Sequence, residues 1–281
     1  MVLDWIYNNP TWLWGSVMVG GFVATSCIGL AIFQRLVHLD IRRAHNDLAG
    51  FTVAIISVVY AVLLAFIAIA TWETFTNASE IVDREADYVG SIYRDTQGLP
   101  SAMGQDIRND LNQYVNVVIK QEWPIQQSGK TPDQGWVPLR KLHSAIVTMR
   151  PQNMGEAVIE AELLRTLNAL YRARSSRLSA VEGHIPPVIW WIIFLGGAIT
   201  TGYTYLFGFE NFTMHLVMTA AVAAMLGLVV VLIIALDWPF RGEVSVTPKA
   251  FIETQLSWAD LSFDTGQNPA PDQSPGPPAG Q

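Results

Sequence analysis

Charged residues are scarce in this sequence and are absent from four long stretches of it. Only 15% of the 281 residues are charged and 51% are hydrophobic, whereas about 25% of residues are charged in soluble globular proteins. Each stretch is about as long as the roughly 20 residues that a helix needs to cross the hydrocarbon core of a bilayer. The stretches cover residues 13–33, 51–72, 188–207 and 212–236. We therefore predict an all-α membrane protein with four transmembrane helices.

Further absences exclude whole classes of function. Cys27 is the sole cysteine and lies inside the first stretch, so the chain forms no intramolecular disulfide. The net charge of −7 argues against nucleic acid as a partner, because nucleic-acid binding needs a basic face. Nucleophile elbows, phosphate loops, HExxH helices and paired Cys motifs are missing, so we expect neither an enzyme nor a cofactor. Asp4 precedes the first stretch without any Lys or Arg, and we do not expect a cleaved signal peptide.

The loop between the first two stretches contains His38, Asp40, His45 and Asp47. A metal site needs three or four converging ligands, and nothing in this spacing imposes that geometry, so we expect no metal. We expect Asn46 and Asp47 to cap the second transmembrane helix instead, because an acidic side chain is favoured at a helix N-terminus.

Apolar side chains recur at helical spacing between the second and third stretches, which predicts an extramembrane helical bundle. The second transmembrane helix is expected to continue into water as far as Gly98 to Pro100, and Trp123 and Pro124 are expected to end a following helix. The predicted boundaries are 1–76 for transmembrane helices 1 and 2, 77–185 for the extramembrane helical bundle, 186–237 for the transmembrane hairpin of helices 3 and 4, 238–264 for an amphipathic C-terminal segment, and 265–281 for a disordered tail.

One face of the second transmembrane helix resembles a pore lining, which needs an unbroken line of small polar and apolar side chains. The alternative is that Ser57 and Tyr60 hydrogen-bond to a neighbouring helix, because polar residues in membranes often join helices. The residues of this face are Ser57, Tyr60, Leu64, Ile67 and Thr71.

Two sets of charges flank the predicted bundle where it meets the membrane. An acidic ring concentrates cations and a basic ring concentrates anions, so the sequence leaves the sign of a conducted ion open. The alternative is that the two sets pair with each other and fix the bundle on the membrane. The acidic set is Glu73, Glu80, Asp83, Glu85 and Asp87, with Arg84 among them, and the basic set is Arg172, Arg174 and Arg177.

Asp237 ends the fourth stretch and is followed by Trp238 and Pro239. Its carboxylate is expected either to hold the turn at the membrane boundary or to bind a cation. Anchoring of Trp238 at the interface is the interpretation that we favour for this segment.

Four separated motifs resemble the bestrophin-like family of bacterial membrane proteins. They occur between Arg42 and Phe251, in the family's order and with the same layout of membrane spans. The motifs are HNDLAG, with His45, Asn46 and Asp47; YAVLLAF at 60–66; EWP, with Glu122, Trp123 and Pro124; and DWPFRG, with Asp237, Pro239, Phe240, Arg241 and Gly242. DWPFRG is similar to the start of the bestrophin calcium clasp, but the acidic run that binds calcium there is missing here.

The resemblance implies an ion-conducting homo-oligomer in a bacterial plasma membrane, pentameric like the bestrophins. Its second transmembrane helix lines the pore, its extramembrane helices form a vestibule, and its partners are the lipid bilayer and inorganic ions. The competing hypothesis is a non-conducting membrane scaffold or sensor whose helical domain binds a partner.

Two arguments about membrane orientation conflict. The first loop carries Arg35, Arg42 and Arg43 while the N-terminal tail has no Lys or Arg, which favours a cytoplasmic first loop by the positive-inside rule. The bestrophin arrangement that the resemblance implies is the opposite one, so orientation stays open.

Overall fold

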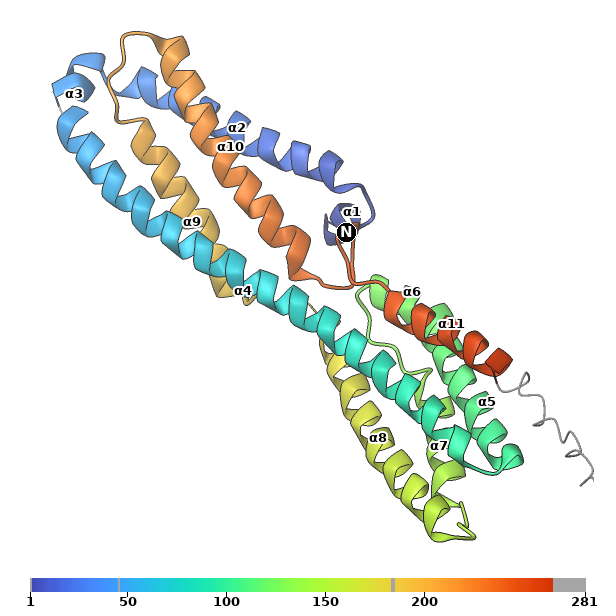
Figure 1. Cartoon of the computed structure of the whole chain (residues 1–281). Coiled ribbons are helices and arrows are strands. Elements are labelled where there is room, and N and C mark those ends of the chain that lie inside the picture. The colour runs from blue at the N-terminus through green and yellow to red at the C-terminus, as the bar shows by residue number, and fades with distance from the viewer. Residues whose placement is uncertain (1, 45, 183–184, 265–281) are drawn as a thin grey trace, which may run out of the picture. The chain divides into compact units, whose positions relative to one another are not determined.

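Every secondary-structure element in the described residues is a helix. The computed structural model describes residues 2–44, 46–182 and 185–264. Among these residues, four helices are long and apolar enough to cross a membrane. They are α2 (Thr11–Leu36), α4 (Asn46–Asp95), α9 (Pro187–Thr204) and α10 (Phe212–Asp237) (Figure 1). The predicted all-α membrane fold with four transmembrane helices is therefore confirmed.

The membrane-spanning helices, with α4 as far as Ile81, belong to one compact unit. Within it α2 and α10 pack side by side (Figure 1). Gly227 permits this close approach, because a Cβ there would lie 3.2 Å from the Cα of Val19. Two short helices, α1 (Val2–Tyr7) and α3 (Leu39–Ala44), precede and follow α2 along the chain.

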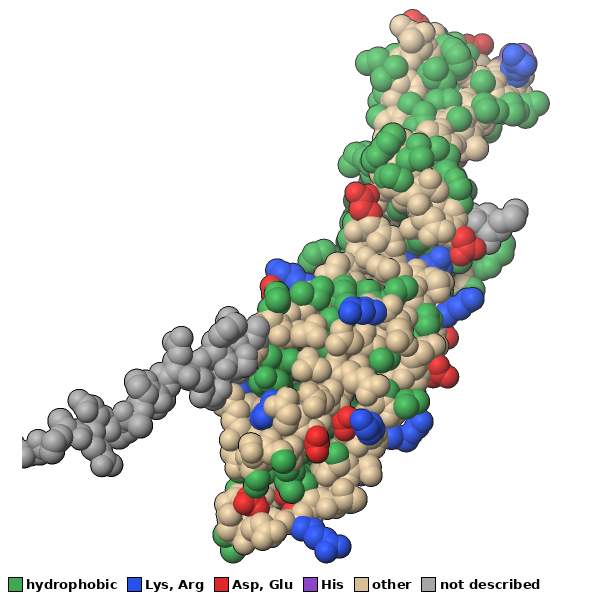
Figure 2. Space-filling model, turned by 90° about the vertical axis from the view of Figure 1, so that its right-hand side faces the viewer, with side chains coloured by type: hydrophobic (Ala, Val, Ile, Leu, Met, Phe, Trp, Pro, Cys, Tyr) green, Lys and Arg blue, Asp and Glu red, His purple; other side chains and the backbone are tan. Residues whose placement is uncertain are grey.

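The outer surface of these helices is apolar. Figure 2 shows hydrophobic side chains over the membrane-spanning helices, in the upper part of the view, with few charged side chains among them. Large residues such as Trp12, Trp191 and Met225 are exposed. An apolar surface this extensive is unfavourable in water, and lipid is the solvent that suits it.

The second compact unit is a helical bundle. It contains the end of α4, α5 (Ser101–Val117), α7 (Trp136–Val147), most of α8 (Met154–Ser179) and α11 (Lys249–Asp264). A 3₁₀ turn at Thr96–Gly98 follows α4, where the sequence predicted its end. The ring of Trp258 in α11 stacks on Tyr93 in α4 with 4.4 Å between centroids. The predicted disordered tail, 265–281, lies outside the described residues.

The helix that approaches Pro124 does not end there, contrary to the prediction. It continues through a π-helical turn, Val118–Glu122, into α6 (Trp123–Gln127). The N–H of Trp123 bonds to the carbonyl of Val118, five residues earlier. Since proline has no N–H to donate, the regular ladder is already interrupted at this point, and a π turn accommodates the interruption. The turn carries Glu122, whose side chain is fully buried.

Candidate functional site

The predicted pore-lining face of α4 packs largely inside the chain. Tyr60, Leu64 and Thr71 are 7%, 4% and 4% exposed, while Ser57 and Ile67 are half-buried. The hydroxyl of Tyr60 donates a hydrogen bond to a backbone carbonyl in α9, that of Ile193. Tyr60 therefore joins two spans, as the alternative interpretation of this face expected.

The opposite face of α4 is a continuous exposed apolar stripe. It contains no charged residue between Phe51 and Trp72, and the chain's own helices leave it uncovered. This exposed α4 face consists of Phe51, Ile55, Val58, Val59, Val62, Phe66, Ile69 and Trp72, each 50% exposed or more.

The two sets of charges predicted to flank the bundle divide into exposed and buried side chains. The side chains of Glu73, Glu80, Asp83 and Arg172 are exposed. By contrast, Glu85, Arg174 and Arg177 are 0% exposed, which corrects their placement as charges facing an ion path. The helical spacing of the sequence identifies both arginines as polar positions but does not show that they are buried. A buried charge is stable only with partners close by.

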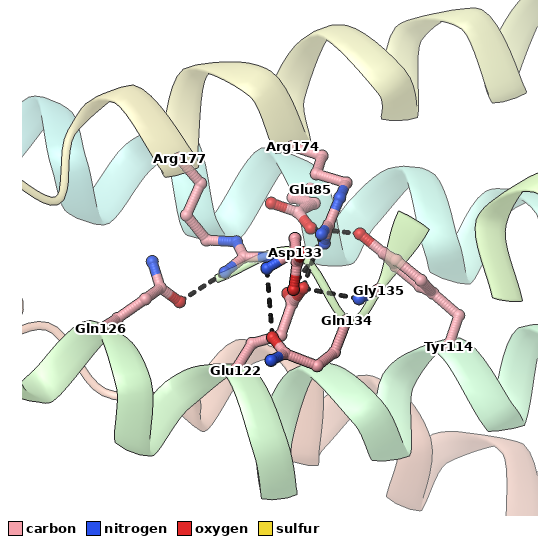
Figure 3. A network of polar contacts seen from close by, with 9 residues as sticks. All are labelled: Glu85, Tyr114, Glu122, Gln126, Asp133, Gln134, Gly135, Arg174 and Arg177. Atoms are coloured by element: carbon pink, nitrogen blue, oxygen red, sulfur yellow. Dashed lines mark hydrogen bonds and ion pairs between the residues drawn. The ribbon is translucent and has the colours of Figure 1, made fainter. Parts of the chain in front are cut away.

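Glu122 is such a partner, because it forms a bidentate ion pair with Arg174 inside the bundle (Figure 3). The Arg174 Nη1 and Nη2 atoms donate to Glu122 Oε2 and Oε1 at 2.8 and 2.5 Å. The backbone N–H of Gly135 also donates to Oε1, at 2.7 Å. The guanidinium lies over the Trp136 ring, 4.7 Å from its centroid. Glu122 of the EWP motif thus links the π turn to α8 and to the start of α7.

Two further polar contacts join buried side chains of different helices. The hydroxyl of Tyr114 in α5 donates to Glu85 Oε1 of α4 at 2.5 Å. Arg177 Nη1, in the last turn of α8, donates to Gln126 Oε1 of α6 at 2.5 Å (Figure 3). Trp123 of the same motif is buried against Phe251 of α11, whereas Pro124 is exposed.

The DWPFRG motif forms a turn that holds the N-terminal helix. Asp237 Oδ1 accepts the N–H of Ile185 at 3.1 Å, so this carboxylate joins the end of α10 to the segment that leads into α9. Arg241 pairs with Asp4 at 3.0 Å and lies over the ring of Tyr7 at 5.0 Å. Burial raises the pKa of the Tyr7 hydroxyl.

Other residues of this motif shape the same turn. The carbonyl of Pro239 accepts the N–H of Val246 at 2.8 Å, and Phe240 is fully buried. Gly242 has a φ of +85°, a left-handed conformation that favours glycine. Among the described residues, no group of three or more His, Cys, Asp or Glu side chains is placed to hold a metal ion.

The HNDLAG motif joins two loops between membrane-spanning helices. Asn46 Oδ1 accepts the N–H of Gly208 at 2.8 Å, and its Nδ2 donates to the Gly208 carbonyl at 3.5 Å. Asn46 is also the first residue of α4, and Asp47 lies exposed in the first turn. His45, where a cap would lie, is outside the described residues.

Sequence reasoning missed several partners of these motifs. Gly135, Asp4 and Gly208 carry no local signal, because each lies far along the chain from the residue that it contacts. Only the three-dimensional contact identifies them.

A family model described as Bestrophin-like domain matches residues 20–251. Two crystal structures described as a membrane protein are similar at TM-scores of 0.61 and 12% identity; they cover 91% and 89% of this chain and 98% and 99% of their own. A crystal structure of a mutated bacterial bestrophin homologue from Klebsiella pneumoniae has a TM-score of 0.60 and 12% identity, covering 91% of this chain and 99% of its own. At such identity the likeness shows the fold. No curated protein matches.

Proposed function

This chain belongs to the bestrophin-like family, and from that premise we propose that it forms a homo-oligomeric ion channel, pentameric by resemblance, with α4 lining the pore. The proposed location is the plasma membrane, and the proposed partners are lipid, further copies of the chain and inorganic ions. The fold and the multi-pass membrane character are the established part of this description.

The exposed α4 face is the observation that carries the proposal. The buried face of α4 is occupied by contacts such as that between Tyr60 and Ile193, so the exposed face is the one that can meet a central axis. Its residues are bulky and apolar, and hydrophobic constrictions of this kind gate channels by dewetting. The proposed pore lining therefore moves from the Tyr60 face to the face with Val62 and Phe66.

The charges that remain exposed are suited to a pore mouth. Glu73 follows the apolar stripe directly, and Glu80 and Asp83 lie about two and three turns further along α4. Rings of acidic side chains at a mouth concentrate cations. Arg172 is the exposed basic residue of the predicted set.

Conductance in planar bilayers tests the proposal. The purified chain is expected to pass ions, and Val62→Ser is expected to raise the current because a polar residue makes a dewetted constriction easier to wet. Val217→Ser in α10 is the matched control, because Val62 and Val217 are 50% and 57% exposed and the substitution is the same. We expect the control to conduct like the wild type.

Two outcomes would contradict the proposal. A folded, reconstituted oligomer that never conducts would favour the scaffold or sensor hypothesis. A monomer in crosslinking experiments would remove the central axis altogether.

A further inference from the structure

A buried arginine lies beside the loops that join the membrane-spanning helices. Arg42 in α3 is 6% exposed. Its Nη1 donates to the Phe207 carbonyl at 3.3 Å, and its Nε has no hydrogen-bond partner. Within the described part of the chain, no carboxylate forms an ion pair with Arg42. The adjacent Arg43, by contrast, is 39% exposed and pairs with Glu210 at 2.5 Å.

The positive charge of Arg42 is therefore buried with no carboxylate of the described residues paired to it. Burial lowers the pKa of Arg42, yet arginine remains charged in proteins. A buried charge is costly unless it is paired and hydrogen-bonded. The site is therefore suited to an anion that is not part of the chain.

Arg42 lines a cavity of about 320 Å³. The cavity lies at the end of α2, the start of α4 and the end of α9, which is the boundary of the membrane-spanning segments. Two of its residues, Thr52 and Tyr203, carry hydroxyls. That of Thr52 donates to the Leu48 carbonyl at 2.8 Å, so the Tyr203 hydroxyl is the one that can donate a hydrogen bond to an oxyanion. The rest of its wall, apart from Arg42, is apolar: Val37, Ile41, Leu48, Ala49 and Leu206.

We propose that this cavity binds the anionic headgroup of an acidic phospholipid, with Arg42 as the counter-ion and the apolar wall against the start of an acyl chain. Charge complementarity selects an anion, and the apolar wall together with the position at the membrane boundary selects one that is attached to a hydrocarbon chain. A free inorganic anion would leave that wall unused. The inference does not depend on ion conduction.

Lipid-dependent thermal unfolding of the full-length chain in detergent tests this site. A ligand that binds the folded state raises the melting temperature in proportion to the logarithm of its concentration over its Kd. Phosphatidylglycerol is expected to raise the melting temperature more than phosphatidylcholine with the same acyl chains. Arg42→Gln is expected to remove that difference, and the matched control Arg43→Gln to keep it.

A second variant keeps the test decisive if Arg42→Gln does not fold. Leu206→Trp retains the arginine but fills the cavity, and it too is expected to lose the phosphatidylglycerol effect. Equal shifts with both lipids in the wild type would overturn the proposal, as would a difference that survives Arg42→Gln. A shift of the same size with inorganic phosphate alone would assign the site to a free anion and would also overturn it.

Discussion

Removing the charge of Glu122 is expected to destabilise the helical bundle strongly. Both Glu122 and Arg174 are fully buried, and two hydrogen bonds of 2.8 and 2.5 Å join them. Glu122→Gln keeps the shape of the side chain and an acceptor for the Gly135 N–H. It removes the negative charge beside the guanidinium, however, and breaking a buried pair in this way costs about 3–5 kcal/mol. We expect the lower end, about 3 kcal/mol, because the amide still accepts a hydrogen bond.

Denaturant unfolding of the detergent-purified chain, followed by circular dichroism, measures this loss. The double variant Glu122→Gln with Arg174→Met is expected to recover much of the stability, since replacing both members of a buried pair is often neutral. The cycle of four proteins gives the coupling energy directly. Arg172→Gln, an exposed position on the same helix, is the control and should unfold like the wild type. An unchanged midpoint for Glu122→Gln would refute the assignment of a stabilising role to the pair.

Three further changes test individual contacts. Gly135→Ala places a Cβ 2.6 Å from the Arg174 guanidinium, and we expect a loss of about 1–3 kcal/mol from overpacking, measured by the same unfolding. Gly208→Ala brings a Cβ against the backbone of α3, with a nearest contact of 2.6 Å, and is expected to lower the melting temperature; Gly202→Ala, with open space around it, should not. Arg241→Gln removes an ion pair to the N-terminal helix, so limited proteolysis should cut that helix sooner; an unchanged rate would argue against this contact.

The membrane-spanning helices were predictable because their signal is local. Uncharged runs of this length have one stable form in lipid, and the structure places helices over all four of them. The unbroken continuation of α4 from its apolar stretch to Asp95 followed from its apolar periodicity for the same reason.

The candidate site was less predictable because its residues meet over long distances in the sequence. The spacing of Arg174 fits a solvated helix face as well as a buried one, and its partner Glu122 is 52 residues away. The polarity of Tyr60 shows that its hydroxyl needs a partner, but not whether that partner is water in a pore or the Ile193 carbonyl, so the sequence leaves both interpretations open. Pro124 predicts a helix end because proline interrupts the hydrogen-bond ladder. The chain can instead continue through a π turn, and the local sequence pattern does not reveal which of the two occurs.

Thiol accessibility along α4 tests the central proposal most directly. With Cys27 replaced by Ala, single cysteines at Phe66 and at Tyr60 would be treated with a charged, water-soluble thiol reagent while current is recorded in planar bilayers. Phe66→Cys is expected to react and lose current, because that position lies on the exposed α4 face, whereas Tyr60→Cys should be protected by its packing against α9. Modification and block at Tyr60→Cys, with Phe66→Cys unreactive, would contradict the proposed pore lining.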